Sequence, residues 1–217
     1  MNEPSESLRT EATRRHLHAV AELLLAGPQY RTSGTIRLRP APGGFATIAA
    51  PALRVDRGDL VVGVSGSAGE RRIRLAGATI RELAAAATVT AGAPENLYPD
   101  GSGARPEDVV EVDPDASAAL AAWFGLGERA QRRLAPDVTP VLWPEHFDLA
   151  ITLDEVNYGV SPGDSWCPAP YAYVGPWTPR AEEFWNAPFG AARRAADLGD
   201  EDALVDFYEE GQQAAVG

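Results

Sequence analysis

Residues 53–66 read LRVDRGDLVVGVSG, and this stretch indicates the kind of fold. Apolar and polar side chains alternate along it, and turn-forming glycine and aspartate residues divide it into short segments. A period of two residues is typical of strands with one buried face. The same rhythm continues on both sides, so the sequence predicts an antiparallel meander from about residue 33 to residue 76.

A helix is expected before this meander. Leu17, Val20 and Leu24 recur at helical spacing between Thr10 and Ala26. Gly27-Pro28 follows directly, and a proline after the last periodic residue usually ends a helix. We therefore expect this helix to stop at Gly27-Pro28.

Three further helices are expected after the meander. Residues 79–91 predict a short helix that packs on the sheet. Asp113 is a favourable N-cap and Pro114 a favourable first helical residue, so a second helix should run from there to about Leu134. The last helix should span residues 200–215, and its buried residues should be Leu204, Phe207 and Tyr208.

The second half of the chain is strand-rich again. Residues 140–177 predict a hairpin and one further strand, YAYVGPW. Pairing Leu153 with Val156 in the hairpin sets Ala150 opposite Gly159. The whole pattern predicts an α+β fold of antiparallel meanders packed with helices, with two halves in one compact body.

We expect one domain over residues 1–217. Its N-terminal half would cover about residues 10–90 and its C-terminal half about residues 113–217. Residues 91–112 show no convincing periodicity, and we interpret them as the loop that joins the halves.

Composition excludes several classes of function. The formal net charge of −12 disfavours binding to nucleic acids and to anionic lipid surfaces. No apolar run approaches the ~20 residues that span a bilayer. The N-terminus lacks a signal-peptide core, and a single cysteine permits no internal disulfide. We expect a soluble cytoplasmic protein.

Lysine chemistry and metal chemistry also find no support. All 19 basic residues are arginines, so Schiff-base catalysis and a Walker A lysine are impossible in this chain. His16 and His18 diverge on a helix, Cys167 has no neighbouring cysteine, and the acidic residues 108–115 lack the spacing of an EF-hand. We expect no metal site and no cofactor.

The hairpin offers the best candidate for a site. In an extended segment from residue 146, His146 and Asp148 share one face with Asn157 of the second strand. Ala150 and Gly159 form a floor on which another group has room to approach. His146 with Asp148 could then act as a metal-free general base. The alternative is an ordinary solvent-exposed polar face.

Residues 159–163, GVSPG, match the nucleophile elbow of serine hydrolases, but the match fails chemically. The residue after Ser161 is Pro162, which has no N–H for the oxyanion hole. We instead expect a type II turn with a positive φ at Gly163. Asp164 would bond nearby backbone or point over the polar face.

Aromatic residues are concentrated in the same region. Ten of the 17 aromatic residues lie between Trp143 and Phe189, in a proline-rich context typical of binding clefts as well as of aromatic cores. Our leading hypothesis is a small-molecule cleft in the C-terminal half, lined by His146, Asp148, Asn157, Asp164, Trp166, Tyr171 and Tyr173. Whether such a cleft only binds or also catalyses stays open.

Two resemblances accompany these patterns. The segments LWPEHFDLAI, NYGVSPGD, PYAYVGPW and FWNAPFGAARR resemble a group of actinobacterial hypothetical proteins and, more distantly, a bacterial family of unknown function with W/F-P-x-H-F-D and P-G-D segments. That resemblance implies one cooperative module and no particular reaction. Residues 33–90 are faintly similar to sterol-carrier-type domains, which implies a carrier of an apolar ligand. A protein-interaction module with exposed aromatic residues is the remaining alternative.

Overall fold

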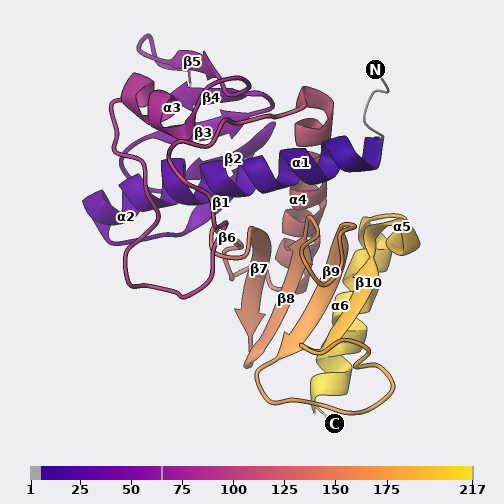
Figure 1. Cartoon of the computed structure of the whole chain (residues 1–217). Coiled ribbons are helices and arrows are strands. Elements are labelled where there is room, and N and C mark those ends of the chain that lie inside the picture. Colours follow the sequence, from indigo (N-terminus) through magenta and orange to yellow (C-terminus); the bar gives the residue numbers. More distant parts are fainter. Residues whose placement is uncertain (1–5, 65, 217) are drawn as a thin grey trace. The chain divides into compact units, whose positions relative to one another are not determined.

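The computed structural model describes residues 6–64 and 66–216 (Figure 1). The chain divides into two compact units. Unit 1 comprises the chain up to Ala122 together with Leu142–Phe147, and unit 2 comprises Trp123–Val141 and the chain from Asp148 onward. Both units combine antiparallel strands with helices, which confirms the α+β class. The loop over residues 91–112 lies wholly within unit 1.

The sheet of unit 1 confirms the predicted meander. Successive strands pair antiparallel, and Leu53, Val55 and Leu60 alternate inward as the sequence predicts. A short strand from later in the chain joins at the edge, where Leu142 pairs with Leu38. In spatial order the strands are β6 (Val141–Trp143), β1 (Leu38–Ala41), β2 (Gly44–Thr47), β3 (Leu53–Asp56), β4 (Asp59–Val62) and β5 (Arg71–Arg74).

The first helix runs further than predicted. It comprises α1 (Glu6–Ala19), a π-helical segment η1 (Val20–Ala26) and α2 (Gly27–Ser33), so the expected stop at Gly27-Pro28 is wrong. In η1 the Gly27 N–H donates to the carbonyl of Glu22, five residues back. This wider turn rearranges the backbone ladder, and the proline falls in the first turn of α2, where a missing N–H is tolerated.

Close packing surrounds η1, whose residues are all buried. The segment lies against β1, β2 and α3 (Ile80–Ala87) within unit 1. A Cβ atom at Gly27 would lie 1.7 Å from the carbonyl oxygen of Gly92, so only glycine allows the loop to approach this closely. The fully buried Gln29 fixes α2, since its amide donates to Thr35 and Arg37 and accepts two backbone N–H groups after β2.

The predicted cap of α4 (Pro114–Leu134) is confirmed, and α3 has a capping box that the sequence analysis did not predict. Thr79 and Glu82 form a capping box at the start of α3. The Oδ1 atom of Asp113 accepts the N–H groups of Asp115 and Ala116 at 2.9 Å, and α4 then runs from Pro114 to Leu134. This helix belongs to unit 1 as far as Ala122 and to unit 2 from Trp123.

The sheet of unit 2 contains the predicted hairpin. Leu153 pairs with Val156, and Ala150 lies opposite Gly159, as expected. In spatial order the strands are β7 (Asp148–Leu153), β8 (Val156–Ser161), β9 (Tyr171–Pro176) and β10 (Ala191–Arg194), of which β10 was not expected. Two helices follow, α5 (Ala195–Leu198) and α6 (Glu201–Val216).

Helices cover one face of the strands of unit 2. A Cβ atom at Gly127 of α4 would lie 2.3 Å from Val160, and one at Gly211 of α6 would lie 2.7 Å from Val174. The buried Gln131 donates to the backbone carbonyls of β7 and β8. The three α6 residues expected inside are buried, as predicted: Leu204, Phe207 and Tyr208. Among the described residues, no helix combines the length and apolarity needed to cross a membrane.

Candidate functional site

The face of the unit 2 sheet opposite these helices carries several of the predicted site residues. The register pairs Gly159 with Tyr173 and Ser161 with Tyr171. Because paired residues point to the same side of a sheet, the two tyrosines share a face with Asp148 and Asn157. The strand pattern therefore brings four predicted residues to one face: Asp148, Asn157, Tyr171 and Tyr173.

The space above the small residues on this face is filled by the protein itself. A Cβ atom at Gly159 would lie 2.3–2.5 Å from the ring and hydroxyl atoms of Tyr173. The Tyr173 hydroxyl donates a hydrogen bond to Asp148. The floor of Ala150 and Gly159, which we interpreted as room for a ligand, thus accommodates a side chain from the neighbouring strand.

Burial keeps this tyrosine protonated. The loss of hydration and the nearby Asp148 carboxylate raise the pKa of Tyr173 well above its usual value. The phenol is therefore a permanent hydrogen-bond donor at ordinary pH. The hydroxyl of Tyr173 therefore holds the Asp148 carboxylate as a hydrogen-bond donor.

Asn157 lies at the other end of β8 from Ser161. Its side-chain oxygen accepts from the Thr152 hydroxyl at 2.7 Å and from the Trp177 indole at 3.3 Å. Thr152 and Trp177 are exposed. Asn157 shares the face of Tyr171 and Tyr173, but it does not line the pocket described below, which includes Trp166 and Tyr171.

The turn after β8 is organised by Asp164. As predicted, Gly163 has a positive φ, of 102°. The Oδ1 atom of Asp164 accepts the N–H groups of Trp166 and Cys167 at 2.8 and 2.9 Å, and its Oδ2 atom accepts the Tyr171 hydroxyl at 2.5 Å. One carboxylate thus fixes the loop that carries Trp166 and the hydroxyl of Tyr171.

A pocket of about 580 Å³ lies beside this loop, within unit 2. We call it the aromatic pocket. It includes two of the residues that the sequence predicts, Trp166 and Tyr171, and adds residues from β10 and the segment before it. Its lining residues are Trp166, Cys167, Pro168, Tyr171, Asn186, Ala192, Arg193, Arg194 and Asp197.

Aromatic rings form a continuous cluster at this pocket. The Trp166 ring contacts Tyr171 and Phe189 edge to face, with centroids 5.2 and 5.0 Å apart. Phe189 also lies beside Tyr173. Trp166 remains 45% exposed and Phe189 37% exposed. The cluster therefore holds its rings in fixed orientations and still leaves aromatic surface uncovered.

Two arginines on β10 add positive charge to the lining. Arg193 pairs with Glu210, and its guanidinium lies 4.7 Å from the centroid of the Phe207 ring. Arg194 is exposed. The side-chain amide of Asn186 donates to the carbonyl of Ala192 in β10 and accepts the N–H of the same residue, which fixes the pocket wall beside the arginines.

His146 does not lie on a strand. The extended segment predicted from residue 146 begins only at Asp148, because residues 144–147 form a turn in which Phe147 has a positive φ of 53°. His146 is exposed in unit 1, whereas Asp148 belongs to unit 2. The shared face for these two residues is therefore wrong as an extended-strand argument, and their pairing as acid and base stays a prediction.

Ser161 has a structural setting. It is buried at the end of β8, its hydroxyl accepts the Gly163 N–H at 3.1 Å, and its carbonyl accepts the Trp123 indole at 2.9 Å. These contacts agree with the chemical rejection of the hydrolase motif.

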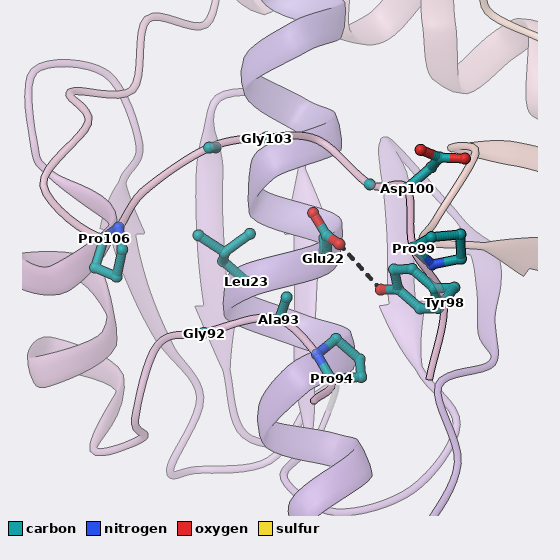
Figure 2. Close-up of a pocket in the computed structure, with 12 residues that line it drawn as sticks. Glu22, Leu23, Gly92, Ala93, Pro94, Tyr98, Pro99, Asp100, Gly103 and Pro106 are labelled. Carbon is teal, nitrogen blue, oxygen red and sulfur yellow. Dashed lines mark hydrogen bonds between the residues drawn. The ribbon is translucent and has the colours of Figure 1, made fainter. Parts of the chain in front are cut away.

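A second pocket, of about 310 Å³, lies in unit 1, and the sequence analysis did not find it (Figure 2). It is bounded by η1 and by the loop that follows α3. Glu22 of η1 is 3% exposed, and its carboxylate accepts the Tyr98 hydroxyl at 3.1 Å. We call it the Glu22 pocket. Its lining residues are Glu22, Leu23, Gly92, Ala93, Pro94, Tyr98, Pro99, Asp100, Gly101, Gly103, Ala104 and Pro106.

One sequence signal could have led to this pocket. Glu22 is the only charged residue in VAELLLA, the stretch that forms η1. A carboxylate within an otherwise apolar helical segment has to be buried with polar partners. Those partners come from residues 98–102, and no sequence periodicity in that loop predicts that they contact Glu22. Within residues 6–64 and 66–216 no group of three or more metal-ligating side chains is assembled, in this pocket or elsewhere.

Comparison with known proteins adds no assignment to these two pockets. No protein-family model, curated protein or solved structure matches this chain.

Proposed function

We propose that this chain binds a small molecule with an aromatic ring and an anionic group, and that the ligand occupies the aromatic pocket of unit 2. The observation that carries the proposal is the partly exposed aromatic cluster of Trp166, Tyr171 and Phe189 beside a pocket of about 580 Å³. Pockets for small molecules typically measure ~300–1,000 Å³ and are lined by aromatic residues with a few polar groups.

The aromatic part of the ligand follows from the exposed indole. The backbone N–H of Trp166 is held by Asp164, and its ring is held by two neighbouring rings. An indole fixed in this way loses little side-chain entropy when a ligand stacks on it. Aromatic pairs contribute ~0.5–1.5 kcal/mol beyond the area that they bury.

The anionic part follows from the β10 arginines. Arg193 already pairs with Glu210, so Arg194, which is exposed at the lining, is the better partner for a carboxylate or similar group. A guanidinium binds a carboxylate with two parallel hydrogen bonds. The exposed Asp197 is a pocket residue of opposite charge, so we expect moderate affinity.

The protein's own donors also support binding rather than proton transfer at this pocket. Burial and the hydrogen bond to Asp164 raise the pKa of Tyr171 above its usual value, so its hydroxyl stays protonated. The general acid–base alternative with His146 and Asp148 finds no supporting contact at this pocket. The apolar-carrier alternative requires a lining without charged residues, which this pocket does not have.

The test is a titration with indole-3-acetate, followed by calorimetry and ligand-observed NMR. Trp166→Leu should weaken binding by about tenfold or more, because stacking of this kind is worth ~1–3 kcal/mol. Arg194→Gln should weaken the binding of indole-3-acetate and leave the affinity for the neutral alcohol indole-3-ethanol unchanged.

Trp177→Leu is the matched control, since Trp177 is 62% exposed and does not line the pocket. It should bind like the unaltered chain. Failure of the unaltered chain to bind aromatic anions at millimolar concentration would overturn the proposal, and so would equal losses in the Trp166 and Trp177 variants.

A further inference from the structure

We propose that the Glu22 pocket is a second binding site and that its ligand is a small organic ammonium ion. The pocket lies wholly in unit 1 and shares no lining residue with the aromatic pocket. The proposal depends on the buried carboxylate, the charge of the lining and the shape of its walls.

The carboxylate of Glu22 has hydrogen-bond donors but, in the part of the chain that the structure describes, no positively charged group paired with it. It accepts the Tyr98 hydroxyl at 3.1 Å, the Ser102 N–H at 2.8 Å and the Ser102 hydroxyl at 2.5 Å. All three donors are neutral. None of the ion pairs among the described residues includes this carboxylate, and although its charge acts on His18, burial lowers the pKa of that imidazole and favours its neutral form. A buried charge without a counter-ion is costly, so a cation that enters the pocket gains the missing interaction.

The lining carries only negative charge. Glu22 and Asp100 are its two ionisable carboxylates, and no basic residue is part of it. Tyr98 donates to Glu22, and burial together with that carboxylate raises the pKa of the phenol above its usual value. The phenol therefore stays neutral. Such a lining repels anions and attracts cations.

The walls favour an organic cation over a metal ion. Pro94, Pro99 and Pro106 supply apolar surface, together with Leu23 and the ring of Tyr98 (Figure 2). Hard metal ions require about six oxygen ligands, which two carboxylates and proline rings do not provide. Methyl and methylene groups of an alkylammonium suit this surface, and the tyrosine ring adds a cation–π contact.

Local backbone geometry brings the loop against the carboxylate. A Cβ atom at Gly101 would lie 2.2 Å from Glu22 Oε1, so glycine at this position lets the loop close on the acid. Glu22 itself lies in η1, and π-helical turns are frequent at functional sites because they displace side chains from the regular helical positions. Both features place one carboxylate at a pocket wall without exposing it to bulk water.

The experiment titrates the full chain with n-butylammonium and with choline, followed by calorimetry and NMR. The neutral isostere n-butanol and the anion butyrate are the ligand controls. We expect the two cations to bind and the two controls not to bind. Glu22→Gln should weaken cation binding by about tenfold or more, because it removes one partner of a buried charge pair.

Two further variants separate binding from folding. Ala93→Leu fills the pocket and retains the carboxylate, so it should abolish cation binding while the far-ultraviolet spectrum stays unchanged. Glu95→Gln removes an exposed acid of the same loop that does not line the pocket, and it should bind like the unaltered chain. If Glu22→Gln does not fold, the proposal is tested by cation binding to Ala93→Leu and by the comparison of n-butylammonium with n-butanol in the unaltered chain. Equal binding of n-butylammonium and n-butanol overturns the proposal, as does unchanged cation binding by Ala93→Leu.

Discussion

Two carboxylate–tyrosine pairs, one in each unit, show how similar chemistry can give different outcomes. In unit 2, Tyr173 of β9 donates a hydrogen bond across β8 to Asp148 of β7. In unit 1, Tyr98 donates to Glu22 from a loop. Both acids are buried, 7% and 3% exposed, and both tyrosines have raised pKa values because of burial and the adjacent charge. Glu22 and Tyr98 both line the Glu22 pocket, whereas neither Asp148 nor Tyr173 is part of the lining of the aromatic pocket.

The difference lies in what occupies the space left by a glycine. The register of β8 and β9 fixes Tyr173 over Gly159, so a side chain of the sheet closes that space. At Gly101 the loop backbone itself approaches Glu22, and the space beside it stays open. In both units a glycine allows another part of the chain to approach it closely. Whether a pocket remains beside the buried carboxylate depends on whether a side chain or only loop backbone fills that space.

The largest effect is expected for Gly159→Ala. The added methyl group would meet the hydroxyl end of the Tyr173 ring, which its hydrogen bond to Asp148 holds in place. Overpacking of this kind costs about 1–3 kcal/mol, and we expect the upper part of that range in urea unfolding. Gly125→Ala is the matched control, since its nearest neighbour would be an arginine side chain at 3.6 Å and alanine favours a helix.

A double variant tests the cause of this loss. If the clash with Tyr173 is responsible, Gly159→Ala should cost much less in a chain that also carries Tyr173→Leu. Additive losses would show that the glycine is required for another reason, and the account of a filled space would then be wrong.

A smaller effect is expected for removal of each hydroxyl. Tyr173→Phe withdraws a donor from a buried carboxylate and should destabilise the chain by ~1–3 kcal/mol. Tyr98→Phe should cost less, because the two Ser102 donors still hold Glu22 and Tyr98 is half-buried. Urea unfolding of both variants measures the difference. A larger loss in Tyr98→Phe would reverse the comparison and mark the loop as the more rigid of the two settings.

Much of the fold was predictable because it depends on local patterns. Alternation predicted the meander of unit 1 and the hairpin and β9 of unit 2, but not β10, and the register of the hairpin followed from its two-residue turn. Asp113 and Pro114 predicted where α4 begins. The continuation past Gly27-Pro28 was not predictable from such rules, because it depends on a π-helical turn that packs against the sheet.

The candidate sites were less accessible to sequence reasoning. The positive φ at Gly163 and the gathering of Trp166 and Tyr171 at one pocket could be anticipated from turn chemistry and aromatic density. The filling of the Gly159 space required knowing which residue of β9 lies opposite. The Glu22 pocket joins residues about 80 positions apart, and no local pattern encodes that contact.

The smallest effect is expected in the response to mild acid, which should act on unit 1 through His18 and Glu145. The raised pKa values of Tyr171 and Tyr173 act only in alkali, whereas His18 of unit 1 titrates below neutrality. Burial is the main cause that lowers the pKa of His18 below 6.5, although Glu22 opposes it. Its ring stacks on Phe147 and its Nε2 donates to the Pro144 carbonyl at 2.8 Å.

Because the pKa of His18 is lower in the folded state, the unfolded chain binds the proton first as the pH falls. The stabilisation from neutral His18 is present above pH 6.5 and is lost as the pH falls through the folded value, at no more than about 1.4 kcal/mol per pH unit. Glu145 acts in the opposite sense, since burial raises its pKa and favours its protonated form in the fold. Unfolding midpoints between pH 7.5 and 5 should therefore decline less in His18→Gln, and more in Glu145→Gln, than in the unaltered chain. Parallel profiles for all three chains would mean that acid acts on other groups, and the assignment of this acid response to His18 and Glu145 of unit 1 would then fail.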